Sequence, residues 1–157
     1  MGQMRKKSWT EKLADSKDLP RIERITGKMS KRWGSGTVVI PAPKEVEAIM
    51  RKIPRGKLIT INEIRAALAK KHGATIGCPI TTGIFAWIAA NAAEEQRAEG
   101  RKDITPYWRT LKSGGIVNEK YPDLRRQIKL LEEEGHKLIR KGKKYIVEGF
   151  EESLAKI

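Results

Sequence analysis

The middle of the chain carries apolar residues at helical spacing, interrupted by residues that start and stop helices. From Pro43 to Ile53 the apolar positions lie three or four apart, which predicts an amphipathic helix ended by Pro54-Arg55-Gly56. Thr60 and Glu63 then have the spacing of a capping box, in which the two residues satisfy the first amides of a helix. This second helix is predicted to close at His72-Gly73.

A third helix is predicted to begin at Pro79, because proline suits the first helical position, and to run to Ala93. Its apolar side carries Ile80, Ile84, Trp87 and Ile88, and at helical spacing Phe85 and Trp87 are expected in the core. The charged run from Glu94 to Asp103 predicts a frayed helix end or a solvated loop without a chemical role. The second and third helices together predict a helix-turn-helix, a pattern that purely structural helix pairs share.

Pro106-Tyr107-Trp108-Arg109 places two large aromatic rings between a proline and an arginine. Because proline fixes its own backbone and favours an extended residue before it, we expect Tyr107 and Trp108 at a defined bend. In a basic protein this bend is a candidate wall for a nucleotide, since bases stack on aromatic faces and a guanidinium binds phosphate. The alternative is a strand that enters the core with Trp108 buried beneath a solvated Arg109.

The last third of the chain predicts two hairpins and one helix. A tight hairpin turns at Ser113-Gly114-Gly115, and a helix covers the segment from Pro122 to Glu134. A second hairpin from Leu138 to Val147 turns on glycine between Lys141 and Lys143. These lysines are candidate contacts to a phosphate backbone, as in a wing, or they serve solubility.

Residues 1–42 are mostly basic and polar, and we predict a basic N-terminal arm in front of a main domain of residues 43–157. Trp9 and Trp33 are candidates to fix the arm to that domain, and Thr37-Val38-Val39-Ile40 predicts a strand. Basic arms often bind nucleic acid. The alternative is an extension that wraps the domain for stability.

The charge of the chain points to a polyanionic partner. The 33 Lys and Arg against 19 Asp and Glu give a formal charge of +14 and a pI near 10, which favours nucleic acid. No apolar run approaches the roughly 20 residues of a membrane span, and none follows the basic N-terminus as in a secretory signal, so we expect a cytoplasmic protein without membrane contact. The single cysteine excludes an internal disulfide, and we expect no metal and no cofactor.

A series of short motifs follows in order between Pro43 and Tyr145. They are Ile53-Pro54-Arg55-Gly56-Lys57, the helix pair, Gly77-Cys78-Pro79, Pro106-Tyr107-Trp108-Arg109, Ser113-Gly114-Gly115 and Glu134-Gly135-His136-Lys137-Leu138. In combination they resemble the DNA-binding domain of the alkylguanine DNA alkyltransferases. The resemblance implies an α/β domain with a winged helix-turn-helix-like core and short hairpins.

In that family the tetrapeptide is Pro-Cys-His-Arg, whose cysteine accepts the alkyl group after the histidine helps remove its proton. Here Tyr107 stands at the cysteine position and Trp108 at the histidine position. A phenol with a pKa near ~10 and an indole cannot replace a thiolate paired with imidazole. Glu134 matches the carboxylate that orients the family's histidine, which is absent here. The better match is the alkyltransferase-like branch, which has tryptophan for the cysteine, transfers no alkyl group and flips the damaged base.

The resemblance therefore implies a non-catalytic protein that binds double-stranded DNA and recognises alkylated guanine in repair, with any protein partner left open. The implied base pocket comprises Tyr107, Trp108, Arg109 and Tyr121. The implied DNA contacts are Thr60, Ile61, Thr81, Thr82, Gly83, Lys141 and Lys143. Ile61 and Gly83 stand where the family has a tyrosine that rotates the nucleotide and an arginine that fills the gap in the duplex, so two groups that assist base flipping are missing. Phe85 or Trp87 is the alternative group to stabilise the open duplex, although their helical spacing favours the core.

Two other functions remain as alternatives. The first is a general nucleic-acid-binding or regulatory winged helix without a pocket for a lesion. The second is an enzyme that uses Cys78, the sole thiol, but this residue lies outside the aromatic tetrapeptide and does not match the acceptor cysteine. We expect Cys78 to be a helix-start or core residue instead.

Overall fold

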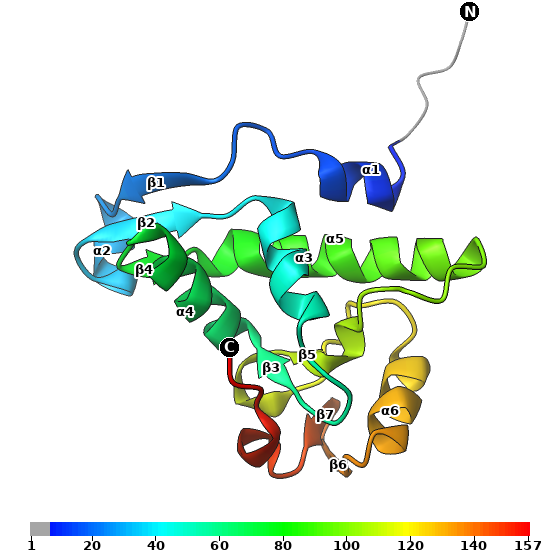
Figure 1. The fold of residues 1–157 in the computed structure, drawn as a ribbon. Coiled ribbons are helices and arrows are strands. Elements are labelled where there is room, and N and C mark those ends of the chain that lie inside the picture. The colour runs from blue at the N-terminus through cyan, green and yellow to red at the C-terminus, as the bar shows by residue number, and fades with distance from the viewer. Residues whose placement is uncertain (1–6) are drawn as a thin grey trace, which may run out of the picture.

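Three helices from the middle of the chain form the centre of the structure, a computed structural model that describes residues 7–157. α3 (Pro43–Arg51) and α4 (Ile61–His72) both pack against α5 (Pro79–Ala98), which runs across the molecule (Figure 1). The short strand β4 (Ile76–Gly77) lies between α4 and α5. The predicted pair of helices joined by a turn is therefore present.

The ends of α4 and the start of α5 follow the sequence signals. The backbone N–H of Thr60 donates a hydrogen bond of 2.9 Å to the Glu63 carboxylate, as the capping box predicts. Gly73 ends α4 in the left-handed conformation, with φ at +66°, which glycine adopts without a steric penalty. Pro79 occupies the first turn of α5, where its missing N–H costs nothing.

The N-terminal helix α1 (Trp9–Ala14) packs along the second half of α5. The Glu95 carboxylate on α5 accepts a hydrogen bond of 3.0 Å from the backbone N–H of Trp9. This contact stabilises the last turn of α5, which lies beyond the apolar pattern that predicted the helix. The helix runs to Ala98, five residues beyond Ala93, so the first part of the charged run from Glu94 to Asp103 belongs to the helix end, one of the two alternatives for it.

A three-stranded sheet lies at the start of α5. β1 (Arg21–Arg24) pairs antiparallel with β2 (Thr37–Ile40), and β2 pairs in parallel with β4. The short helix α2 (Lys28–Trp33) lies in the connection between β1 and β2. The predicted strand at Thr37–Ile40 is confirmed as β2.

The segment of residues 7–42 packs closely on the rest of the chain. Leu13 is fully buried in the main hydrophobic core, and the ring of Trp9 meets Trp87 edge-on with 4.8 Å between ring centroids. These contacts are those of an extension that wraps the domain. Residues 1–6 of the predicted arm lie outside the described residues, and the division of the chain after residue 42 stays a prediction.

The segment after α5 returns to the centre of the fold. β5 (Thr110–Leu111) pairs in parallel with β3 (Ile59–Thr60), which directly precedes α4. The turn at Ser113–Gly115 is a single 3₁₀ turn closed by an isolated bridge between Lys112 and Ile116. The predicted tight turn is therefore present with one antiparallel bridge, and the hairpin extends no further because Thr110 and Leu111 pair with β3.

The C-terminal elements match their predictions more closely. α6 (Leu124–Glu133) is followed by the hairpin of β6 (Leu138–Lys141) and β7 (Lys144–Val147). The chain ends in a 3₁₀ turn (Phe150–Ser153), after which Leu154 bridges to Leu58 beside β3.

The Glu134 carboxylate joins three parts of the fold at the end of α6. Its side chain is 2% exposed and accepts hydrogen bonds from the Trp108 indole N–H at 2.8 Å and from two Arg109 nitrogens at 2.9 Å. Arg109 also donates to the backbone carbonyl of Ile53 at 2.7 Å. Burial acts to raise the pKa of Glu134, but the hydrogen bonds from Arg109 and Trp108 outweigh it and hold the pKa below its usual range.

We expect Glu134→Gln to lower the free energy of unfolding at pH 7 by about 3 kcal/mol, because it leaves the buried Arg109 charge without a counterion. A carboxyl group whose pKa is lowered on folding stabilises above its unfolded pKa, near ~4.3, and loses this effect as pH falls through its folded pKa. The substitution should therefore also flatten the acid limb of the stability profile. Urea unfolding between pH 7 and pH 3 measures both effects.

The neighbouring Glu133→Gln is the matched control, because Glu133 is exposed and its side chain forms no ion pair within residues 7–157. It should change the unfolding free energy by less than about 0.5 kcal/mol. Equal losses in the two variants would contradict a special role for the Glu134 carboxylate.

Candidate nucleic-acid interface

A groove of about 470 Å³ opens beside the first halves of α4 and α5. This volume lies within the range of roughly 300–1,000 Å³ that is typical of ligand sites. The lining residues are Ile61, Asn62 and Arg65 of α4, Pro79, Ile80, Gly83, Ile84 and Trp87 of α5, and Lys112, Ser113, Asn118 and Lys120 of the following segments.

The floor of the groove is an exposed apolar face of α5. Ile80, Ile84 and Trp87 are 54%, 46% and 37% exposed, so the expectation that Trp87 lies in the core is wrong. Phe85 is partly buried and packs on the main core, as predicted. The face of α5 that enters the core consists of small side chains: Thr82, Ala86, Ala89, Ala90 and Ala93. Three of the four large residues on the predicted apolar side, Ile80, Ile84 and Trp87, therefore face solvent, and the fourth, Ile88, packs on the core.

The Trp87 side chain is held at the edge of this groove. Its indole N–H donates a hydrogen bond of 3.1 Å to the backbone carbonyl of Lys120, and its ring contacts Trp9. A ligand in the groove therefore meets a preformed wall.

Polar contacts across the turn set the other side of the groove. Arg65 donates from Nε to the Gly77 carbonyl at 2.8 Å, and Asn62 donates to the Ser113 hydroxyl at 3.1 Å. A Cβ atom at Gly77 would lie 2.6 Å from the Arg65 carbonyl oxygen, so only glycine allows this close approach.

The rim of the groove is cationic. Lys112 and Lys120 join Arg65 there, and neither lysine forms an ion pair in the described part of the chain. Among residues 7–157, no Asp or Glu lines the groove. The groove thus combines an apolar floor with positive charge at its edge, which suits a base and its phosphates.

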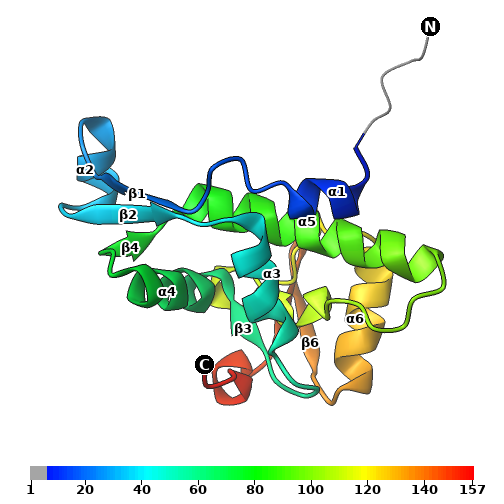
Figure 2. The ribbon, with the colours of Figure 1, turned by 45° about the horizontal axis from the view of Figure 1, so that its top comes forward.

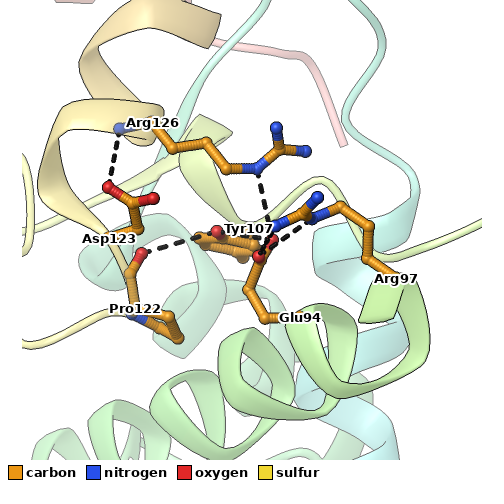
Figure 3. Close-up of polar contacts among 6 residues, drawn as sticks. All are labelled: Glu94, Arg97, Tyr107, Pro122, Asp123 and Arg126. Carbon is orange, nitrogen blue, oxygen red and sulfur yellow. Dashed lines mark hydrogen bonds and ion pairs between the residues drawn. The ribbon is translucent and has the colours of Figure 1, made fainter. Parts of the chain in front are cut away.

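Tyr107 lies in the core, in a 3₁₀ turn (Tyr107–Arg109), and is 0% exposed. Its hydroxyl donates a hydrogen bond of 2.9 Å to the Glu94 carboxylate of α5 (Figure 3). Arg97 donates two hydrogen bonds to the same carboxylate, and Arg126 of α6 forms an ion pair with it at 3.4 Å. Figure 3 shows both guanidinium groups directed at Glu94.

Burial raises the pKa of the Tyr107 hydroxyl well above its usual range, and the Glu94 charge adds to this effect. Burial also acts to raise the pKa of Glu94, but hydrogen bonds from Arg97 and Tyr107 outweigh it and lower the pKa. At neutral pH the pair is therefore a phenol that donates and a carboxylate that accepts.

The other residues of the predicted base pocket are also engaged in packing. Trp108 and Tyr121 are 8% and 3% exposed, and both rings meet Tyr107 edge-on with centroids 5.5 and 5.9 Å away. Arg109 is held by Glu134. Hydrogen bonds and ring contacts hold Tyr107, Trp108 and Tyr121 in the core and Arg109 at its edge, so the four side chains form no open cavity here, and their role as a base pocket stays a prediction.

The predicted DNA contacts divide into buried and exposed residues. Thr60 and Thr82 are 2% and 0% exposed, so their side chains are buried in this structure, and their contact with DNA stays a prediction. Thr60 is occupied by the capping box, and Thr82 faces the core side of α5. Ile61 and Gly83 both line the groove. They were predicted as DNA contacts from the family resemblance, which did not imply a groove.

Three further predicted contacts lie elsewhere. Thr81 is partly buried on α5, and its hydroxyl is enclosed. Lys141 and Lys143 are exposed at the turn of the β6–β7 hairpin. Their contact with DNA stays a prediction.

Cys78 is confirmed as a residue of the helix start. It is 6% exposed, and its backbone N–H donates to the Val39 carbonyl at 2.9 Å. The side chain belongs to a small hydrophobic cluster with Ile25 and Val38. This thiol does not line the groove.

Sequence reasoning missed several residues of this region. Glu94 lay in a run to which no role was given, although Arg97 three positions later is a local signal for an ion pair. Its partners Tyr107 and Arg126 lie too far away in sequence to leave a pattern. The remaining missed residues line the groove: Asn62, Arg65, Ile80, Ile84, Lys112, Ser113, Asn118 and Lys120.

Between residues 7 and 157 no helix combines the length and apolar character needed to cross a membrane. The same residues hold no group of three His, Cys, Asp or Glu side chains placed to bind a metal ion.

Comparison with known proteins gives matches only among solved structures. The sequence matches no protein-family model and no curated protein. S. pombe Atl1 in complex with damaged DNA containing O6-carboxymethylguanine matches with a TM-score of 0.51 and 22% identity, over 73% of this chain and 94% of that chain. S. pombe ATL in complex with DNA matches with a TM-score of 0.52 and 21% identity, over the same shares of the two chains.

These likenesses establish the architecture. The chain is a small mixed α/β domain with helices, short sheets and hairpins, and its fold is similar to that of the S. pombe alkyltransferase-like protein, as the sequence motifs predicted.

Proposed function

We propose that the protein is a non-catalytic, alkyltransferase-like DNA-binding protein that recognises alkylated guanine in double-stranded DNA. The observation that carries this proposal is the groove on the helix pair, with Ile84 and Trp87 on its floor and Lys112 and Lys120 on its rim. One solved structure of similar fold holds damaged DNA containing O6-carboxymethylguanine. The formal charge of +14 favours the same kind of partner.

The groove supplies the groups that an extruded base requires. An alkylated base needs an apolar surface for its added carbon atoms and a face to stack on, and Ile84 and Trp87 offer both. Lysines at the rim bind the flanking phosphates. This role places lesion recognition in the groove and not at the buried Tyr107.

A second candidate function is a general DNA-binding protein without lesion preference. The observation that favours it is the burial of Tyr107, which occupies the position of the family's acceptor cysteine and is tied to Glu94. On this view the helix pair binds the duplex, and the groove holds part of the backbone. The two functions differ in their affinity for damaged against intact duplex.

We expect no alkyl transfer from O6-methylguanine DNA to the protein. Cys78 is the sole thiol, and it is buried at the start of α5 in a hydrophobic cluster. The Tyr107 hydroxyl is protonated and buried, so it offers no nucleophile. Mass spectrometry of the intact protein after incubation with methylated duplex should show an unchanged mass. A stoichiometric gain of one methyl group would overturn the non-catalytic assignment.

We expect DNA affinity to fall steeply with salt, because bound phosphates displace counterions. With ~4–6 phosphate contacts, log K should fall by ~4–5 per tenfold rise in salt. Lys112→Gln with Lys120→Gln should lower this slope by about two. Fluorescence anisotropy with an undamaged duplex across a salt series measures the slope.

Lys52→Gln with Lys57→Gln removes the same charge from exposed positions away from the groove and should leave the slope nearly unchanged. A slope near zero for the unaltered protein would exclude DNA as its partner. If both double variants lower the slope equally, the effect comes from net charge and not from the position of the lysines in the groove.

We expect Ile84→Ala to weaken binding to alkylguanine duplex more than binding to intact duplex. The substitution removes apolar contact from the groove floor worth up to about 2 kcal/mol, or roughly 30-fold in affinity. Ile22→Ala is the control, since Ile22 is 47% exposed on β1 and does not line the groove.

Competition between the two duplexes at one salt concentration measures the preference. An equal loss on both duplexes favours the general DNA-binding function, and a loss on neither contradicts a role for the groove floor.

A further inference from the structure

The segment from β1 to β2, residues 21–40, forms a basic hairpin that projects from the start of α5 (Figure 2). In both views it lies at the end of the molecule away from α6. It is anchored by the parallel pairing of β2 with β4, the strand that leads into α5. A small cluster of Ile25, Val38 and Cys78 fills the space beneath it, with Met29 and Trp33 packed alongside.

The charge of this basic hairpin is almost uncompensated. It carries five Lys and Arg residues and one carboxylate, Glu23, for a net charge of +4. Glu23 is occupied by Arg21 at 2.9 Å. The other four cations, Arg24, Lys28, Lys31 and Arg32, are exposed and form no ion pair within the described residues.

Three of these cations share one face of α2. Lys28, Lys31 and Arg32 follow the i, i+3, i+4 spacing that places side chains side by side on a helix. Met29 and Trp33, between and after these cations, pack against the small cluster. Like charges at this spacing repel one another, so the face is more stable when an anion neutralises it.

Charged edge strands also protect a sheet from aggregation, and this explains part of the hairpin. All four residues of β1 are exposed, and β1 is the free edge of its sheet. Lys28, Lys31 and Arg32 lie on α2 and not on β1, so edge protection does not account for them. Their positive charge is complementary to a polyanion.

The place of α2 identifies which polyanion fits. α2 connects β1 to β2, and β2 pairs directly with β4, the strand that leads into α5. α5 lines the candidate groove, and duplex DNA carries one charge for each ~1.7 Å of its axis. A duplex held at the groove and continuing past the start of α5 brings its phosphates to α2.

We propose that the Lys28, Lys31 and Arg32 face of α2 is a second contact to the DNA backbone, which flanks the groove and is independent of base sequence. This inference rests on the proposed DNA-binding function. The basic hairpin then raises the affinity for DNA and extends the length of duplex that the protein covers. The groove distinguishes damaged from intact bases.

The test compares the full chain with Lys28→Gln/Lys31→Gln/Arg32→Gln on an undamaged duplex of about 30 base pairs, roughly three helical turns. The triple variant should lower the salt slope by about three and weaken binding at ~0.1 M salt roughly 100-fold. Its hydroxyl-radical footprint should shorten at one flank only. The ratio of affinities for alkylguanine and intact duplex should stay unchanged.

Lys52→Gln/Lys57→Gln/Lys156→Gln is the matched control, with the same loss of charge from exposed lysines near the C-terminal end. Glutamine is a good helix former, so all variants should keep the melting temperature of the parent. If the parent binds no duplex at low salt, the proposed function itself fails. If the parent binds and the α2 variant keeps its slope and footprint, or loses no more than the control, the second contact is refuted alone.

Discussion

The close packing of the small-residue face of α5 is the constraint on which the rest of the structure depends. Thr82 and five buried alanines let this helix pack closely against α1, α3 and the 3₁₀ turn of Tyr107. Phe85 and Ile88 pack at the edge of this face, whereas Ile80, Ile84 and Trp87 face outward. Full burial of a large apolar side chain stabilises a protein by about 1.5–3 kcal/mol, and exposed residues give up part of this stabilisation. An exposed group of such residues on one helix face therefore favours a binding role over a purely structural one.

Two carboxylates hold the aromatic tetrapeptide, a candidate wall for a nucleotide by its sequence, in and beside the core. Glu94 binds the Tyr107 hydroxyl, and Glu134 binds both the Trp108 indole and the Arg109 guanidinium. The sequence resemblance gave Glu134 no histidine to orient. The structure gives it the residue at that same position, because the indole N–H of Trp108 donates as an imidazole N–H would. Geometry is thus kept where the resemblance implies that chemistry is lost.

Local signals predicted most of the elements, and contacts distant in sequence explain the errors. The Thr60 cap, Pro79 and the last hairpin are set by neighbouring residues, so they could be read from the sequence. The side of α5 that enters the core could not, because alanines add little to an apolar pattern and the large residues indicate the wrong face. The burial of Tyr107 depends on Glu94, thirteen residues away on another element.

The energetics of Tyr107 decide where a base can be read. To vacate its site, the residue would break a hydrogen bond to a partly buried carboxylate, at about 1–3 kcal/mol, and two edge-to-face ring contacts, at about 0.5–1.5 kcal/mol each. Base flipping costs a further few kcal/mol, whereas stacking contributes only ~1–3 kcal/mol. Displacing Tyr107 is therefore unfavourable, so under the proposed function a base is expected to bind in the groove, against Ile84 and Trp87, and not in the aromatic core.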